Sequence, residues 1–486
     1  MRALLKFLFV VVLLAGVGFG GAWWWAGRQS GPSIDLKNPD KFVGQTTSLE
    51  LTLQSPEGRF TRADVTLTQN GVNHNVFTLE PKAAAPSPDV KKGAADKVYV
   101  IKPIGRTAIP DLRSGPAKIT VRAARPVLYG LRERETVVTR DVQVRLEPPQ
   151  LAVLSSFHYV NHGGSEFVVY RATPEDVMSG VRVGNKEYRG FPAKGVGITS
   201  DPAMRVAFFA LLFDQALDAP MQVFARDEAG NEAVAALDNR VFPKAYQKSR
   251  IEIDDKFLGR VVPAIASQSP LISVPPNDLL AGFLLINGEL RRANNQYIAD
   301  LAKKTSPDLL FMDEFQQLGD SQVEAKFADT RTYVYKGKDV DQQVHLGFDL
   351  AVTANVPIKA AQKGVIVHAA YLGIYGNCVV IDHGMGVQSL YGHLSAIGVK
   401  VGDKVDKGQV IGRSGMTGLA GGDHLHFTML VGGQQVTPVD WWSAQWMEDR
   451  VFRKIKAAGG PATYTAAAAA ASAPAKHAAR RAKARR

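Results

Sequence analysis

The sequence predicts a mainly β protein with two β-sandwich-like domains, a short helical connector, a C-terminal β-sheet domain and an N-terminal transmembrane helix. Short runs of alternating apolar and polar residues, such as 49–53 and 117–123, are separated by Gly, Pro and Asn turns, which is typical of sandwiches. Apolar positions at helical spacing occur between 277 and 304. The apolar run 7–26 is long enough to cross a bilayer.

We therefore divide the 486 residues into six segments. They are a membrane anchor or signal segment at 1–28, a β-sandwich-like domain at 39–148, a second β-rich domain at 149–245, a helical connector at 246–326, a histidine-rich β domain at 327–445, and a basic Ala-rich tail at 457–486.

The N-terminal segment has the features of a membrane anchor. Arg2 and Lys6 precede the apolar run, and three tryptophans at 23–25 lie at its far end, where an aromatic belt is expected. This order favours a cytoplasmic N-terminus and an exported body. The small residues 20–22 suit a signal-peptidase site, so a cleaved leader is the alternative. The segment has no cysteine, which excludes lipoprotein processing.

The two β-rich domains show no cluster of catalytic residue types, and we interpret them as spacers or binding modules. His158 and His162 are spaced as metal ligands can be, but no third candidate ligand lies nearby in the sequence, so we expect them to be structural. Cys378 is the only cysteine, which rules out an intramolecular disulfide. It lies in an apolar strand and is expected to be buried.

The C-terminal tail is rich in alanine and then in lysine and arginine; its basic residues are Lys476, Arg480, Arg481, Lys483, Arg485 and Arg486. Its prolines and glycines favour disorder. With a net charge of +12, such a tail would attract wall polymers or anionic lipid headgroups. Nucleic acid does not suit an exported body, and a solvated tail without any partner is the alternative.

Five residues in the histidine-rich domain have side chains suited to a catalytic metal centre: His345, Asp349, His393, His424 and His426. Six of the ten histidines lie between 345 and 426. Catalytic zinc takes three protein ligands and keeps a fourth position for water, whose pKa it lowers. Five groups are enough for three ligands and two catalytic imidazoles.

The spacings set limits on the geometry. His424 and His426 head a strand-like run, so they point to one face with Cα atoms about 7 Å apart. This spacing alone does not decide whether both bind the metal. A straight strand would place His345 and Asp349 about 13 Å apart, so we expect a bend at Gly347. No His-Glu-x-x-His string occurs, which excludes the helical zincin motif.

The strings around these residues closely resemble the lysostaphin/LytM-type zinc peptidases, which cleave peptide bonds in peptidoglycan. The resemblance covers about 327–442. It rests on His-Leu-Gly-Phe-Asp-Leu-Ala at 345–351, Gly-Asn-Cys-Val-Val-Ile-Asp-His-Gly at 376–384, Leu-Tyr-Gly-His-Leu at 390–394, Val-Gly-Asp-Lys-Val-Asp-Lys-Gly-Gln-Val-Ile-Gly at 401–412 and His-Leu-His-Phe at 424–427.

The resemblance implies a role for each of the five residues. His345, Asp349 and His426 would be the zinc ligands, and His393 and His424 the catalytic histidines. The implied activity is a zinc metalloendopeptidase that hydrolyses peptidoglycan in cell-wall remodelling, with its catalytic domain outside the cytoplasm. The alternatives are a non-catalytic wall-binding activator of another hydrolase, and a protease acting on exported proteins.

Several nearby residues have their own interpretation. Asp423 stands where many relatives carry proline, and its carboxylate is expected to raise the pKa of His424. His368 and His383 are expected to be structural. The 401–412 stretch resembles lipoyl- and biotin-carrier hairpins, but between histidine motifs we interpret it as scaffold. The small-residue segment 415–422 is expected to form one cleft wall.

Overall fold

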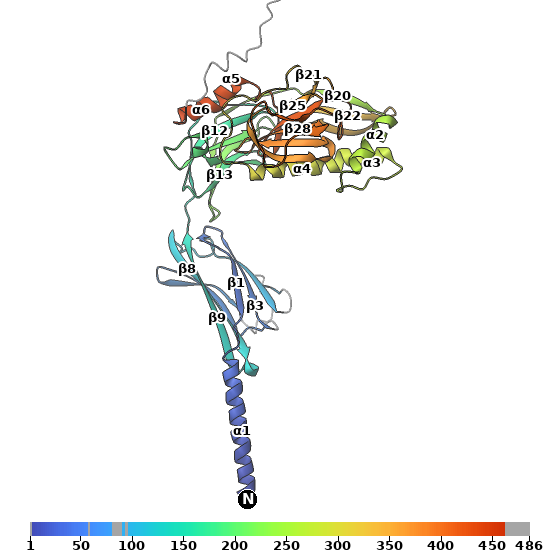
Figure 1. Ribbon diagram of the computed structural model, residues 1–486. Coiled ribbons are helices and arrows are strands. Elements are labelled where there is room, and N and C mark those ends of the chain that lie inside the picture. The colour runs from blue at the N-terminus through green and yellow to red at the C-terminus, as the bar shows by residue number, and fades with distance from the viewer. Residues whose placement is uncertain (1, 57–58, 80–89, 93–95, 462–486) are drawn as a thin grey trace, which may run out of the picture. The chain divides into compact units, whose positions relative to one another are not determined.

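The structure is a computed structural model that describes residues 2–56, 59–79, 90–92 and 96–461 (Figure 1). It is mainly β, as the sequence predicts. The chain divides into two compact units, Met1–Pro149 with Arg226–Glu232, and Gln150–Ala225 with Ala233–Arg486. The basic residues of the predicted tail lie outside the described residues.

The first unit begins with α1 (Arg2–Ala26), which is long and apolar enough to cross a membrane, with a mean hydropathy of 2.4. Two sheets follow. One has the order β1-β3-β7-β6, formed by β1 (Ser33–Asn38), β3 (Ser48–Gln54), β7 (Lys97–Pro103) and β6 (Val90–Lys92). The other has the order β2-β9-β8-β4-β5, formed by β2 (Phe42–Val43), β9 (Arg132–Val144), β8 (Gly115–Val127), β4 (Arg62–Gln69) and β5 (Val72–Leu79).

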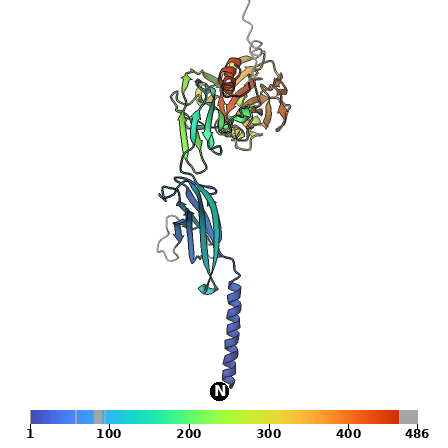
Figure 2. The same cartoon turned by 90° about the vertical axis from the view of Figure 1, so that its left-hand side faces the viewer.

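The two sheets pack face to face because buried apolar residues alternate with exposed residues along their strands (Figure 2). In β3, Leu49, Leu51 and Leu53 are buried, whereas Glu50 between them is exposed. Ile119 and its alternate neighbours in β8 close the other side of the same core. A period of two therefore produces a sandwich, as expected from the sequence.

The second unit starts with its own small sheets. They comprise β10 (Gln150–Val153), β12 (Ser165–Thr173), β16 (Met204–Ala210) and β15 (Phe191–Pro192); β14 (Lys186–Arg189), β13 (Met178–Val183), β17 (Met221–Arg226) and β18 (Glu232–Ala236); and the parallel pair β11 (His158–Asn161) and β19 (Asn239–Phe242). Phe208 of β16 lies 5.6 Å from Trp441, ring centroid to centroid. These strands therefore share one apolar core with the histidine-rich domain.

An eight-stranded sheet forms the centre of the histidine-rich domain. Its strands are β21 (Gln322–Ala325), β24 (Phe348–Ala351), β32 (Leu425–Val431), β28 (Val387–Leu394), β27 (Asn377–Asp382), β26 (Gly364–Tyr371) and β30 (Lys404–Val405) in this order, with β33 (Gln434–Val436) beside β32. Two three-stranded sheets flank it: β25 (Pro357–Lys359), β31 (Val410–Arg413) and β29 (Ala396–Ile397); and β20 (Lys248–Ile253), β22 (Asp329–Tyr335) and β23 (Lys338–His345).

The helical connector covers one side of this domain. It contains α2 (Asp255–Ala266), α3 (Leu279–Leu285), a π-helical turn (Ile286–Leu290) and α4 (Arg291–Leu301), and the helical spacing between 277 and 304 predicts the last three. Phe283 and Ile298 pack in one apolar cluster with Tyr333, Leu390 and Leu430 of the strands. The chain continues into α5 (Ala444–Met447), a π-helical turn (Glu448–Phe452) and α6 (Arg453–Ala457).

Candidate active site

The bend predicted at Gly347 is present, and it brings His345 next to Asp349. His345 ends β23 in one sheet, and Asp349 lies in β24 of the next sheet. Gly347 lies against the ring of His426, where an added Cβ would come within 2.5 Å of Cε1. Only glycine leaves room for this contact, so the chain can turn there without displacing the imidazole.

Three donor atoms converge at this point. His345 Nε2 lies 2.9 Å from Asp349 Oδ1 and 3.0 Å from His426 Nδ1, and His426 Nδ1 lies 3.1 Å from Asp349 Oδ1. All three residues are buried. Among the described residues this is the one group of three or more His, Cys, Asp or Glu side chains arranged to hold a metal ion.

Strand register explains why His426, and not His424, completes the group. Asp349 pairs directly with His426 across β24 and β32. His424 lies one residue before β32 and forms an isolated bridge with Gly415. Its Nε2 is 3.5 Å from Asp349 Oδ1, at the edge of the group. The spacing alone left this choice open, whereas the family resemblance implied His426, and the register places His426 beside Asp349.

The electrostatics favour an ionised Asp349 carboxylate and a neutral His426 imidazole. Burial would raise the pKa of Asp349, but the neighbouring charge of His345 and hydrogen bonds from His345, His424 and His426 hold it well below its usual value. Burial lowers the pKa of His426 to about 4. His345 Nδ1 donates to the carbonyl of Lys326 at 3.1 Å, which leaves the Nε2 lone pair facing the group.

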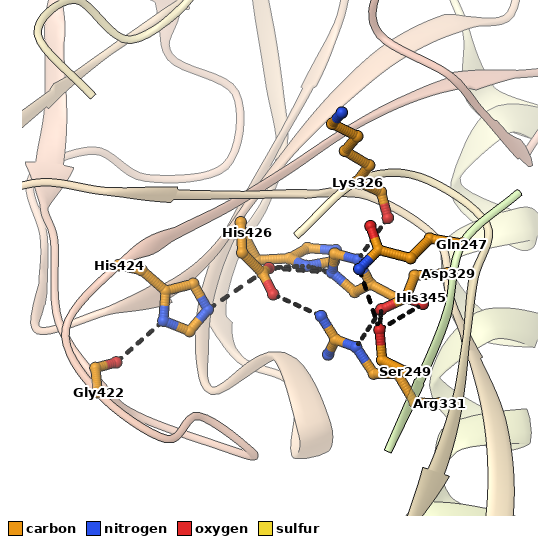
Figure 3. A network of polar contacts seen from close by, with 10 residues as sticks. Gln247, Ser249, Lys326, Asp329, Arg331, His345, Gly422, His424 and His426 are labelled. Atoms are coloured by element: carbon orange, nitrogen blue, oxygen red, sulfur yellow. Dashed lines mark hydrogen bonds and ion pairs between the residues drawn. The ribbon is translucent and has the colours of Figure 1, made fainter. Parts of the chain in front are cut away.

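Figure 3 shows a polar network around Arg331, Asp329 and Ser249, and the hydrogen bond of Arg331 to Asp349 joins it to the donor group. Arg331 Nη2 donates to Asp349 Oδ2 at 2.8 Å, and its Nε lies 3.5 Å from Asp329 Oδ2. Ser249 Oγ donates to the Asp329 carboxylate at 2.8 Å. Arg331 and Ser249 are register partners in the parallel pair β20–β22. One carboxylate oxygen of Asp349 therefore belongs to the donor group, and the other accepts a hydrogen bond from Arg331.

His393 and His424 stand beside the donor group. Their ring centroids are 4.8 Å apart, and that of His393 is 5.7 Å from that of His426. His393 Nδ1 donates to Thr417 O at 2.8 Å, and His424 Nδ1 donates to Gly422 O at 2.9 Å. His393 has a left-handed φ of 64°, a conformation uncommon for residues other than glycine, asparagine and aspartate. In both rings Nδ1 makes the backbone hydrogen bond, so Nε2 is the nitrogen on the other side of the ring.

Comparison with known proteins places this arrangement in a family. Residues 343–438 match Peptidase family M23. The chain carries an M23 peptidase domain. It is 43% identical over 97 residues to "DD-carboxypeptidase/endopeptidase Mpg" of Neisseria meningitidis, covering 20% of this chain and 22% of that protein. It is 44% identical over 92 residues to "Peptidoglycan DD-endopeptidase ShyA" of Vibrio cholerae, covering 19% and 21%. The chain thus spans about a fifth of the length of these relatives.

Among solved structures, the catalytic domain of the antimicrobial peptidase lysostaphin from Staphylococcus simulans is similar to this chain. The identity is 28%, and the match covers 27% of this chain and 98% of that domain, with a TM-score of 0.24. The LytM-type resemblance of the sequence is confirmed by the family match and the named relatives.

The donor group of the M23 domain opens into a cleft of about 390 Å³. Leu419, Gly421 and Gly422 form one wall, so the small-residue segment lines the cleft as predicted. Other lining side chains were not singled out by the sequence: Gln247, Ser249, Arg291, Glu324, Arg331, Tyr333 and Tyr375. Gln247, Ser249 and Arg291 come from the connector, which the motif strings do not reach.

The connector helices hold the cleft walls of the M23 domain in place. Arg260 of α2 donates to the carbonyl of Ala420 at 2.8 Å. Asn294 Oδ1 of α4 accepts from the backbone N–H of Ile374 at 3.0 Å, and Asn295 Oδ1 accepts from Tyr375 OH at 2.9 Å. The helical connector is therefore part of the structure that shapes the cleft.

The pKa of His424 is raised, as expected, but its causes are different. Burial acts against protonation, and the hydrogen bond and charge of Asp349 outweigh it, with a further contribution from Glu324. Asp423 Oδ2 instead accepts from the backbone N–H of Asn355 at 3.2 Å. Its carboxylate connects the segment before His424 to the loop that follows β24.

The remaining histidines singled out by the sequence have structural contacts. His158 bonds to Ser155 and Asp238 O, and His162 bonds to Gln215 O. His368 bonds to Tyr297 OH and Ala370 O, and His383 to Lys363 O and Ser389 Oγ. Tyr391 is buried in the core and its hydroxyl accepts from Ala361 N. None of them belongs to the donor group.

Proposed function

We propose that the protein is a zinc-dependent endopeptidase that cleaves peptide bonds in the stem peptides or cross-links of peptidoglycan. The observation that carries this proposal is the convergence of His345 Nε2, Asp349 Oδ1 and His426 Nδ1 within 3.1 Å of one another in a buried cleft. The M23 domain and the names of its relatives support the substrate.

The donor set fits zinc. Two imidazole nitrogens and one carboxylate oxygen are the ligand types of catalytic zinc sites, and tetrahedral bonds of about 2.0–2.1 Å would separate the donors by about 3.3 Å. The observed separations of 2.9 to 3.1 Å lie close to this value. Zinc, when bound, polarises the scissile carbonyl and supplies hydroxide at neutral pH.

His393 and His424 would handle protons around the scissile bond. His393 donates through Nδ1 to a backbone carbonyl and burial lowers its pKa, so its neutral ring would present Nε2 as a proton acceptor. The bond and charge of Asp349 raise the pKa of His424, so its ring would act as the donor. One imidazole can take a proton from the attacking water, and the other can stabilise negative charge on the carbonyl oxygen. The carbonyl bonds of Thr417 and Gly422 fix both ring orientations before the substrate binds.

The proposed location follows from α1. We propose that α1 remains as a membrane anchor, with the N-terminus in the cytoplasm and the M23 domain outside it. The apolar part of the helix is exposed from Ala3 to Gly21, which suits a lipid environment. Retention in the membrane after high-salt and carbonate washing tests this. A mature N-terminus at Trp23 would show that the segment is a cleaved leader.

Digestion of purified peptidoglycan tests the activity itself. The full chain in detergent should release peptide-cleaved fragments that mass spectrometry can identify, and zinc chelation should stop the release. His393→Ala is the inactive variant, and His368→Gln is the matched control because His368 lies on β26, away from the donor group. If the chain releases no fragments alone but enhances release by an added wall hydrolase, the chain is an activator and the proposal fails. Cleavage of exported proteins in place of wall peptides would equally contradict it.

A further inference from the structure

The long hairpin of the first unit ends in an exposed apolar turn. β8 and β9 are joined by Leu128, Tyr129, Gly130 and Leu131. The side chain of Tyr129 is fully exposed and that of Leu131 is 61% exposed. Leu128 and Tyr129 have left-handed φ angles of 51° and 55°, where glycine or asparagine is the usual choice. Tyr129 and Leu131 are thus exposed at the turn, whereas Leu128 is partly buried.

This turn is tied to the end of α1 by arginines. Arg132 Nη1 donates to the carbonyl of Trp23 at 2.8 Å, and its guanidinium lies 5.2 Å from the Trp23 ring centroid. Arg125 and Arg134 donate to backbone carbonyls at 29–30, at 2.9 and 2.7 Å. Cations suit this place because the last carbonyls of a helix carry partial negative charge. The hairpin tip therefore lies beside the last turn of α1.

That turn of α1 is where a membrane surface would lie. Trp23, Trp24 and Trp25 are 41%, 59% and 61% exposed, and tryptophans at the end of a membrane-spanning helix mark the headgroup level. Because Arg132 connects the tip to Trp23, Tyr129 and Leu131 lie near the same level. The tip is thus continuous with the aromatic end of the helix.

We propose that the β8–β9 tip, Leu128–Leu131, inserts into the headgroup region of the phospholipid membrane that α1 anchors. This rests on the proposed anchoring role of α1. Tyrosine and leucine are suited to that region, because an apolar body can reach the acyl chains while a polar end stays hydrated. Arg28, whose guanidinium lies 3.7 Å from the Trp24 ring centroid, and Arg132 lie where lipid phosphates can contact them.

We assign lipid as the binding partner of the tip because the tip lies beside the end of α1, where the membrane surface would be. A soluble partner would have to bind at the membrane surface, between the aromatic belt and the hairpin. Glu133, the residue after Arg132, is exposed, and the cost of taking its charge out of water limits how deeply the hairpin can insert. The tip would hold the sandwich in one orientation to the membrane.

A site-specific fluorescence experiment tests this with the full chain, one copy per lipid nanodisc. In a Cys378→Ala background, a cysteine at Tyr129 or Leu131 carries an environment-sensitive label (NBD). The matched control is Asp141→Cys, on the same strand β9, far along the hairpin from the tip and with a side chain 85% exposed. Labels at the tip should emit at shorter wavelength and be quenched severalfold by lipids with a spin label near the headgroup. The control label should do neither.

The outcomes separate this proposal from that of the anchor. If the tip labels behave like the control while the chain resists carbonate extraction, the tip does not contact lipid and the proposal is overturned. If the chain leaves the membrane on carbonate washing, the anchoring role of α1 fails, and with it the basis of the tip proposal. Shorter-wavelength emission without quenching by spin-labelled lipid would indicate a protein contact, and would also overturn it.

Discussion

Removal of the Asp349 carboxylate is the most direct perturbation of the proposed metal centre. Its Oδ1 lies within 3.1 Å of both imidazole donors, and its Oδ2 accepts from Arg331 at 2.8 Å. Asp349→Ala leaves two imidazoles and a guanidinium that has lost its bond to Asp349 but stays 3.5 Å from Asp329. We expect zinc affinity to fall for both reasons, since one ligand is lost and one cation remains nearby.

The size of the effect can be worked from the donor set. Structural zinc sites with four ligands bind with about 10–16 kcal/mol, or about 2.5–4 kcal/mol per ligand. Loss of one ligand therefore corresponds to about 10²–10³-fold in affinity, at about 1.4 kcal/mol per factor of ten. The positive charge of Arg331, no longer bonded to Asp349, acts in the same direction. Asp349→Ala should bind zinc at least about 100-fold more weakly than the parent protein.

Equilibrium dialysis against a zinc buffer, with metal measured by mass spectrometry, checks this. Asp349→Asn is the second variant, because it keeps the shape and an acceptor for Arg331 and removes only the charge. Asp339→Ala is the matched control, since Asp339 lies on β23 and pairs with Arg250 at the surface. Parental zinc affinity in a folded Asp349→Ala protein would refute the ligand assignment.

Three further predictions follow from the same structure. His393→Ala and His424→Ala should keep zinc but lose about 10²–10⁴-fold in turnover of peptidoglycan. The control His368→Gln should stay within a few-fold of the parent. Parental turnover in either alanine variant would show that this histidine is not catalytic. Arg331→Gln should weaken zinc binding about 10–100-fold, because the outer oxygen of the carboxylate loses its donor, and dialysis giving an unchanged affinity would contradict this. Burial lowers the pKa of His383 to about 4, below its unfolded value of about 6.5, so the unfolded chain takes up the proton first as pH falls. The contribution of His383 to the free energy of unfolding is complete above pH about 6.5 and falls until pH about 4, by about 2 kcal/mol at pH 5. Denaturant unfolding at several pH values should show that His383→Gln removes this loss. Equal pH dependence of the parent and the variant would disprove the prediction.

The elements with local signals could be predicted from the sequence. The apolar run predicts α1, the helical spacing between 277 and 304 predicts α3 and α4, and the alternation at 49–53 predicts a strand with one buried face. Each of these signals comes from side chains within a few residues of one another. Local patterns are therefore enough to identify the element, and the histidine strings are enough to identify the family.

The contacts around the site depend on pairings that no local pattern reports. Ser249 meets Asp329 only because β20 pairs with β22 across 80 residues of chain. Arg331 in isolation is an ordinary charged residue on a strand with mixed burial. Phe208 lies in a strand in which every residue is buried, and no local pattern shows that it packs against Trp441. The shared core of the second unit was for this reason not evident from the sequence.

The geometry of the donor group depends on more of the chain than the family match at 343–438. His345 ends β23, which pairs with β22, and β22 in turn pairs with β20 from the connector. Arg331, which fixes the outer oxygen of Asp349, lies on the middle one of these three strands. The connector therefore supports the strand that ends in His345 from one side, while its helices hold the cleft walls from the other. Its residues belong to the active site by contact, although they lie outside every motif by which the site is recognised.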